Sequence, residues 1–243
     1  MYLSVLSGIT WLNTSLWGQS QLAAEIWAKE QPQSLRAAMN LAYELEKTQG
    51  ISASQIYLDR FVTKERDSAG IRMIGLVTAC YLQPDADHSD RVNETINAIL
   101  TLPYEGWATD SVEKLMEPVR KGQCPGISEQ QVADIAIAFL RRPVYQEQPA
   151  IASNMLSILG LVAMDQGNME AAMNFYLQSI ENSATYAMSN FYLHLAQKHP
   201  EYAELERLHA AIVRAPVPRK TTQDEWDQLR ATVESSIKSR NAQ

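Results

Sequence analysis

Basic charge, cysteine and long apolar runs are all scarce in this chain of 243 residues. Lys and Arg number 21 against 28 Asp and Glu, so the formal net charge is 21 − 28 = −7. A negatively charged chain is poorly suited to gripping a phosphate backbone, and we expect no nucleic-acid partner. Cys80 and Cys124 are the two cysteines. They form no CxxC pair, which argues against a structural zinc site or a thioredoxin-like motif.

The motifs of common catalytic and nucleotide sites are also missing. No GxxxxGK[ST], GxGxxG, GxSxG or HExxH sequence occurs. His194 and His199 are five residues apart, whereas paired metal ligands on a helix prefer a spacing of i, i+4. The Asp85, Asp87 and Asp90 cluster lacks the glycine and closing glutamate of a calcium-binding loop. We therefore expect no metal, no cofactor and no catalytic residue in this chain.

Two minor alternatives concern the cysteines and the acidic loop. Cys124 lies in the flexible turn 122–126, where an exposed thiol could act as a nucleophile, although no neighbouring base supports this. Cys80 falls on an apolar helical segment and is more simply a small buried residue. In an oxidising compartment the two could instead pair, which only geometry can decide. For the acidic loop we expect a solvated turn in which Ser89 or Asp90 caps the following helix.

What the sequence does contain is an apolar pattern of helical period. With 46% hydrophobic and 20% charged residues the chain has the composition of a soluble globular protein. Apolar side chains recur at i, i+3, i+4, i+7 and i+8 over 132–140 and again over 188–196. Sustained strand-type alternation is absent, and Gly or Pro signals punctuate the pattern at helix-length intervals. The sequence predicts an all-α fold of roughly a dozen helices, most simply a stack of antiparallel pairs, with a closed helical bundle as the alternative.

The ends of the chain are read separately. Residues 1–12 are mostly apolar but too short to cross a bilayer, which takes about 20 residues. They lack the basic region of a signal peptide, and we interpret them as a first packing helix or as the end of a membrane span belonging to a longer protein. At the other end, residues 216–221 form a linker. Thr222 and Glu225 have the spacing of a capping box, and they open a capping helix over 222–239.

Residues 153–186 carry a resemblance to a known repeat. Leu159-Gly160, Gly167, Ala172 and Tyr176 have the spacing seen in the tetratricopeptide repeat (TPR), where small residues let two helices cross closely and the aromatic fills the gap toward the next pair. A weaker match runs from Pro32 through Leu41-Ala42 to Gly50, and Ile74-Gly75 begins a third candidate. The resemblance implies a TPR-like α–α superhelix over residues 1–215, with its best repeat at 153–186. It is absent from 104–150.

A second resemblance concerns the opening of the chain. Trp11, Trp17 and Trp27 lead into KEQPQSLRAAMNLAYEL, followed by a Cys-containing loop and one good TPR. This order is similar to the soluble C-terminal regions of bacterial polytopic membrane glycosyltransferases, among them the O-oligosaccharyltransferases that glycosylate pilin. It implies a periplasmic domain next to a last membrane span, with the catalytic machinery outside this chain. If the chain is not part of such an enzyme, the expected compartment is the cytoplasm.

A stack of helical pairs leaves a concave face that suits a peptide or protein partner. We therefore expect a non-catalytic interaction module, with the accessory region of a glycosyltransferase as the alternative. The TPR resemblance implies that the partner-binding groove is lined by one stripe of each first helix. In this sequence those residues are Arg36, Met39, Tyr43, Glu46 and Lys47 in one repeat, and Asn154, Ser157, Leu161, Met164 and Asp165 in the other.

Overall fold

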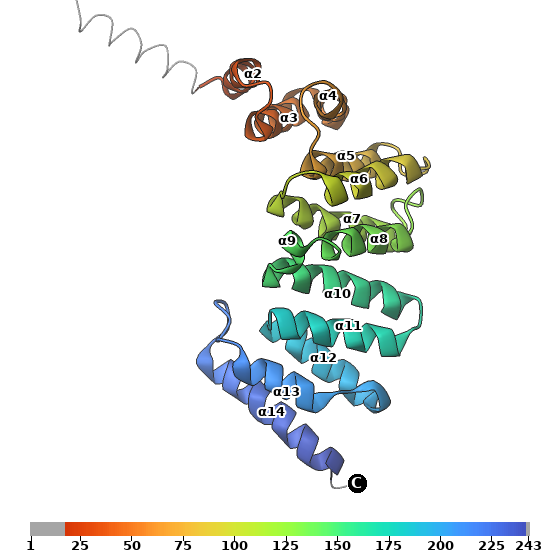
Figure 1. The fold of residues 1–243 in the computed structure, drawn as a ribbon, viewed down its shortest axis with the longest axis vertical. Coiled ribbons are helices and arrows are strands. Elements are labelled where there is room, and N and C mark those ends of the chain that lie inside the picture. Colours follow the sequence, from red (N-terminus) through yellow and green to blue (C-terminus); the bar gives the residue numbers. More distant parts are fainter. Residues whose placement is uncertain (1–17, 242–243) are drawn as a thin grey trace, which may run out of the picture. The chain divides into compact units, whose positions relative to one another are not determined.

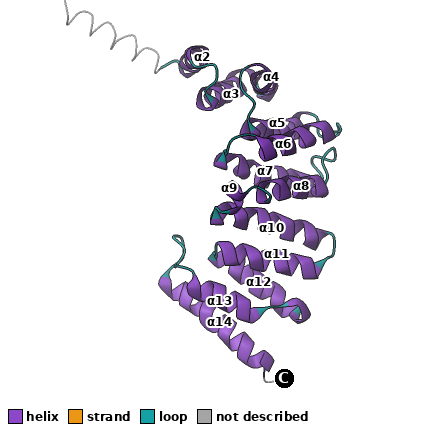
Figure 2. Ribbon diagram, in the orientation of Figure 1, coloured by secondary structure: helices purple, strands orange, loops and turns teal. Residues whose placement is uncertain are grey.

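The computed structural model describes residues 18–241, and those residues are all-α: they contain thirteen α-helices and two short 3₁₀ helices, with no strand (Figures 1 and 2). The expected all-α class is confirmed. The chain divides between Ile127 and Ser128 into two compact units. The interpretation of residues 1–12 as a packing helix or span end lies outside the described residues, as do Trp11 and Trp17.

The first unit consists of helices that pack in neighbouring pairs. Each contacts the next along the chain from α2 to α6, and α5 also packs against α7. The elements of this unit are α2 (Ser20–Glu30), α3 (Leu35–Gln49), α4 (Ile51–Lys64), α5 (Ala69–Leu82), α6 (Ser89–Thr101), the 3₁₀ helix η1 (Gly106–Thr109) and α7 (Asp110–Arg120).

The second unit has its centre in α10 and α11, which make the most extensive contact of any described helix pair. The one-turn helix α9 begins at Pro143, which lies in its first turn, where a missing N–H costs nothing. The elements of this unit are α8 (Glu129–Leu140), α9 (Pro143–Gln146), α10 (Pro149–Asp165), α11 (Met169–Asn182), α12 (Tyr186–Lys198), the 3₁₀ helix η2 (Pro200–Tyr202), α13 (Leu205–Arg214) and α14 (Gln223–Asn241).

Short polar side chains set where the helices begin. Ser34 accepts a hydrogen bond from the backbone of Ala37, and Ser128 forms a reciprocal capping box with Gln131. These bonds satisfy backbone donors that have no partner within the helix. The predicted capping box of the last helix is confirmed, because Glu225 accepts from the Thr222 N–H at 2.8 Å while Thr222 Oγ1 accepts from the Glu225 N–H at 3.2 Å.

The capping expected after the acidic loop is wrong in its detail. The carboxylate of Asp87 accepts the backbone N–H of Ser89 at 2.9 Å, whereas Ser89 and Asp90 lie inside α6. A hydrogen bond from the Ser89 side chain lowers the pKa of Asp87, and the one from its backbone adds to this. A carboxylate just before a helix is also favoured by the helix dipole.

A buried carboxylate from a distant loop completes the start of α5. Glu105 is 6% exposed, and its Oε2 accepts from Ser68 Oγ at 2.7 Å and from the Gly70 N–H at 2.8 Å. Ser68 in turn accepts from the Ile71 N–H at 3.1 Å. The loop after α6 is thereby tied to α5 by charge-assisted hydrogen bonds, which are stronger than neutral ones.

The last helix covers the end of the second unit with one apolar stripe. Trp226, Leu229 and Val233 are buried against α12 and α13, and the remaining face of α14 is mostly exposed. The Arg230 guanidinium donates to the Ile212 carbonyl at 3.2 Å. A cation at this point suits the negative end of the α13 dipole. Such a helix, apolar inside and polar outside, fits the end of a helical stack.

Candidate functional site

The five expected groove residues of α3 lie on one face of that helix. Because each residue advances by about 100° around the helix axis, these five positions fall within about a third of the circumference of the helix. Arg36, Tyr43, Glu46 and Lys47 are exposed, and Met39 is half-buried. The opposite face is buried and consists of Ala37, Ala38, Leu41, Ala42 and Glu44.

The α3 face combines aromatic and cationic side chains. Tyr43 is 57% exposed, and the Lys47 ammonium lies 4.8 Å from the centre of its ring. Arg36 lies 6.0 Å from the ring centre of Trp27 on α2. Cations near aromatic faces are held there by the ring quadrupole. The face therefore offers an accessible aromatic surface with positive charge at both ends, and Glu46 adds one negative charge.

The matching residues of α10 form its least buried stripe. From 152 to 164 this helix is buried all round except at 154, 157, 161 and 164, and Asp165 follows in the exposed C-terminal turn. Asn154, Ser157, Leu161 and Met164 are half-buried. Ser157 Oγ donates to the backbone carbonyl of Asn154 at 2.8 Å. This stripe is less exposed and less charged than that of α3.

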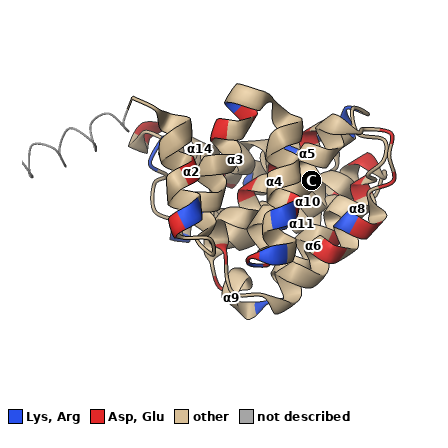
Figure 3. Ribbon diagram, turned by 90° about the horizontal axis from the view of Figure 1, so that it is seen from above, with Lys and Arg blue, Asp and Glu red and all other residues tan. Residues whose placement is uncertain are grey.

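The two stripes belong to different compact units, α3 to the first and α10 to the second. Each is therefore a candidate surface in its own right. Basic and acidic residues are interspersed along the helices rather than gathered by sign (Figure 3). The chemistry of each stripe thus depends on its individual side chains and not on a face of one charge.

Behind the α10 stripe, Tyr176 joins three consecutive helices. A Cβ added to Gly160 on α10 would lie 2.8 Å from Cε1 of Tyr176 on α11, closer than carbon atoms pack. On its other side the ring meets Phe191 of α12 edge to face, with ring centres 5.2 Å apart. The prediction that Gly160 is small where the two helices of a pair cross closely, and that Tyr176 fills the gap toward the next pair, is confirmed at these positions.

A short polar bridge fixes the same helix pair at its other end. Ser153 Oγ and Ser179 Oγ lie 2.9 Å apart, and Ser179 Oγ also donates to the Ser153 carbonyl at 2.9 Å. Both residues are buried. Because buried hydroxyl groups need partners, this bridge specifies how α10 sits on α11.

Sequence reasoning missed a cavity of about 360 Å³ between α4, α5 and α6, whose lining includes several charged side chains. Asp59 is bound by both guanidinium nitrogens of Arg91, at 2.8 and 2.9 Å, and Arg72 pairs with Asp67 and Glu94. Burial raises the pKa of Asp59, but the hydrogen bond and charge of Arg91 outweigh it, so the net direction is downward. These partners are 22 to 32 residues apart except for Asp67 and Arg72. No local spacing signals such a site.

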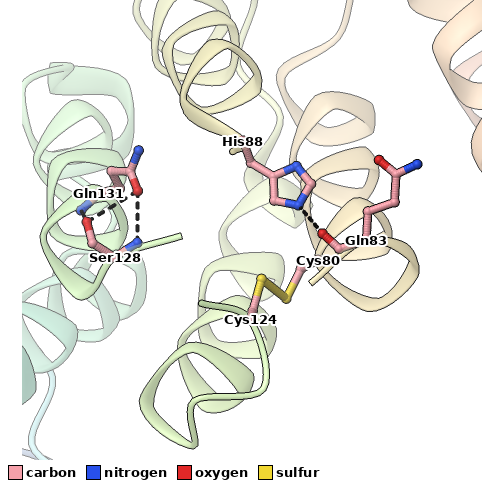
Figure 4. Close-up of a disulfide and its surroundings, with 6 residues drawn as sticks. All are labelled: Cys80, Gln83, His88, Cys124, Ser128 and Gln131. Atoms are coloured by element: carbon pink, nitrogen blue, oxygen red, sulfur yellow. Dashed lines mark hydrogen bonds between the residues drawn. A yellow bond between two sulfur atoms is a disulfide. The ribbon is translucent and has the colours of Figure 1, made fainter. Parts of the chain in front are cut away.

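The cysteines and His88, which could have served in catalysis or metal binding, have structural roles. Cys80 and Cys124 form a disulfide with their Cα atoms 5.4 Å apart, so Cys124 has no free thiol to act as a nucleophile. His88 is buried, and its Nε2–H donates to the Gln83 carbonyl at 2.9 Å (Figure 4). Within residues 18–241, no group of three or more His, Cys, Asp and Glu side chains could hold a metal ion.

No helix in the described part of the chain has both the length and the apolar character to span a membrane. Comparison of the chain with models of protein families, with curated proteins and with solved structures finds no match.

Proposed function

We propose that this chain is a non-catalytic, TPR-like interaction module. It binds a peptide or protein partner along the exposed stripes of α3 and α10, the first helix of each of the two repeats. The observation that carries the proposal is the coincidence of two independent properties on α10. The residues that the repeat pattern assigns to the groove are the same ones that the packing leaves partly open, while their neighbours on every other face are buried.

The chemistry of the stripes supports an extended peptide ligand. On α3, Tyr43 offers an apolar face, and Arg36 and Lys47 supply donors for carboxylates or backbone carbonyls. On α10, Asn154 can both donate to and accept from a peptide group. Aromatic and arginine side chains contribute most of the binding energy at many protein interfaces. A surface of this kind recognises a partner through several spaced contacts rather than one deep pocket.

The test is a variant that removes the α3 stripe without touching the core. Peptides selected from a random library on the intact chain are titrated by calorimetry against the Arg36→Ala, Tyr43→Ala and Lys47→Ala triple variant. The expected result is at least a tenfold loss of affinity with unchanged helical circular dichroism and melting temperature, because each hot-spot contact is worth about 1–2 kcal/mol.

The matched control changes the second helix of the same pair. Ile56, Arg60 and Lys64 are exposed on α4, and replacing all three by Ala removes one apolar and two basic side chains. We expect this control to bind as the intact chain does. Equal binding by the triple variant would exclude the α3 stripe as the site.

A second candidate function is favoured by the disulfide. Disulfides persist in oxidising compartments such as the bacterial periplasm, and Cys80–Cys124 therefore supports the soluble periplasmic region of a membrane-bound O-oligosaccharyltransferase involved in protein glycosylation. In that role the stripes would hold the acceptor protein or the enzyme. The gene upstream of Met1 tests this directly, because it should encode a series of apolar segments of about 20 residues. A gene without them would exclude this candidate.

A further inference from the structure

The Cys80–Cys124 disulfide joins α5 to the turn that follows α7, two elements that are not consecutive in the chain. Cys80 lies in the last turn of α5, and Cys124 lies in the turn that follows α7. In a stack of helical pairs each element is held mainly by its neighbours, so separation between successive pairs is the natural mode of local opening. The cross-link spans such a boundary, because α6 lies between α5 and α7 along the chain.

Both sulfur-bearing residues are sealed from solvent. Cys80 and Cys124 are each 0% exposed. The turn before α6 and the turn after α7, which contains Cys124, are bonded to each other: the Gly126 N–H donates to the Pro84 carbonyl at 2.8 Å, and the His88 N–H donates to the Gly126 carbonyl at 3.4 Å.

The two turns are in close backbone contact at Gly126. A Cβ at this position would lie 1.8 Å from the carbonyl oxygen of Ala86, so the two backbones approach as closely as only glycine permits. Ile127, next in the chain, is 2% exposed. A reductant therefore has no path to either sulfur unless these turns separate.

We propose that the Cys80–Cys124 disulfide is a buried structural cross-link between α5 and the turn after α7, formed while the chain folds in an oxidising compartment. It does not act as a redox switch, because reductants do not reach it in the folded protein. The bond forms by thiol–disulfide exchange with a disulfide oxidoreductase. The thiolate of one cysteine attacks the enzyme's disulfide, and the thiolate of the other then displaces the enzyme from the mixed disulfide. The two electrons leave in the enzyme's dithiol, and the two protons lost by the cysteines go with them. This inference holds whether or not the exposed stripes bind a partner.

The test compares reduction of the folded and unfolded chain. The intact oxidised protein is incubated with excess dithiothreitol in native buffer or in urea above its unfolding midpoint, and thiols are trapped with iodoacetamide and counted by intact mass. Reduction in native buffer should be at least about 100-fold slower than in urea, because the sulfurs react only after local opening. Oxidised glutathione in the same tubes reports how active the reductant is in each buffer.

Two results would overturn the proposal. One is reduction of the folded chain at a rate close to that in urea, after correction by the glutathione standard. The other concerns the compartment: if thiols are trapped with iodoacetamide during lysis of the cells that make the protein, recovery of the chain with both cysteines alkylated would show that the bond is absent there. A Cys80→Ala, Cys124→Ala variant serves as the control, since its mass must not respond to either treatment.

Discussion

Gly160 of α10 and Tyr176 of α11 touch so closely that a single methyl group on the glycine would press on the tyrosine ring, 2.8 Å from its Cε1. The ring cannot retreat, because it is 2% exposed and Phe191 meets it on the far side. This contact sets how close the two helices of the best-defined pair can come, and it connects that pair to the next helix.

Replacement of Gly160 by Ala should therefore destabilise the protein. Overpacking costs about 1–3 kcal/mol, and the higher helix propensity of Ala returns at most about 1 kcal/mol. We expect a net loss of up to about 2 kcal/mol in the free energy of unfolding, measured by urea titration. In a Tyr176→Ala background the same change should become neutral or stabilising. A loss of equal size in both backgrounds would show that the ring is not the cause.

The sequence predicted this joint because its signals are local. Leu159-Gly160, Ala172 and Tyr176 lie within one repeat, and the helical period of the apolar residues places them on facing sides. The same short-range repeat pattern predicted which residues of α10 lie on its partly exposed stripe. At the third candidate repeat, a Cβ on Gly75 would lie 3.4 Å from the side chain of Gln55 on α4, an ordinary van der Waals distance, so the close approach seen at Gly160 is not repeated there.

What could not be predicted depends on contacts between distant residues. The cap that Glu105 places on α5 and the pairing of Asp59 with Arg91 join segments more than 30 residues apart. The disulfide was left open for the same reason, because composition cannot say whether Cys80 and Cys124 meet. The choice of Asp87 over Ser89 at the start of α6 depends on the backbone path of one turn.

Loss of the Glu105 carboxylate should weaken the first unit. With Glu105→Ala, the Ser68 hydroxyl and the Gly70 N–H lose a buried acceptor, and an unsatisfied buried donor costs about 1–3 kcal/mol. Urea unfolding should show a loss in this range, and hydrogen exchange of the first amides of α5 should accelerate. Glu113 is exposed on α7, and Glu113→Ala should change stability by less than about 0.5 kcal/mol. Equal effects of the two changes would contradict the capping role.

The Asp59–Arg91 pair should contribute a small pH dependence. Because the pKa of Asp59 is lowered in the folded protein, its contribution is present above its unfolded pKa of about 4 and is lost as the pH falls through the lower folded value. Both side chains are about two-fifths exposed, at 41% and 42%, so solvent screening keeps the effect below about 1 kcal/mol.

Unfolding titrations of the intact chain and of Asp59→Asn over an acidic pH series measure this contribution. The stability difference between the two proteins should shrink as the pH drops below about 4. Arg91→Gln should show the same convergence, because it removes the other half of the pair. A difference that stays constant over the series would mean that the pair does not lower the pKa of Asp59.

The most direct measurement of the interaction surface is site-specific photo-crosslinking in cells that make the protein. Benzoylphenylalanine is placed at Tyr43 on the α3 stripe or at Ile56 on α4, which are 57% and 71% exposed. The account predicts a discrete crosslinked partner from position 43 that is absent from position 56, although position 56 is the more accessible. The same crosslinked species from both positions, or from position 56 alone, would contradict the assignment of binding to the α3 stripe.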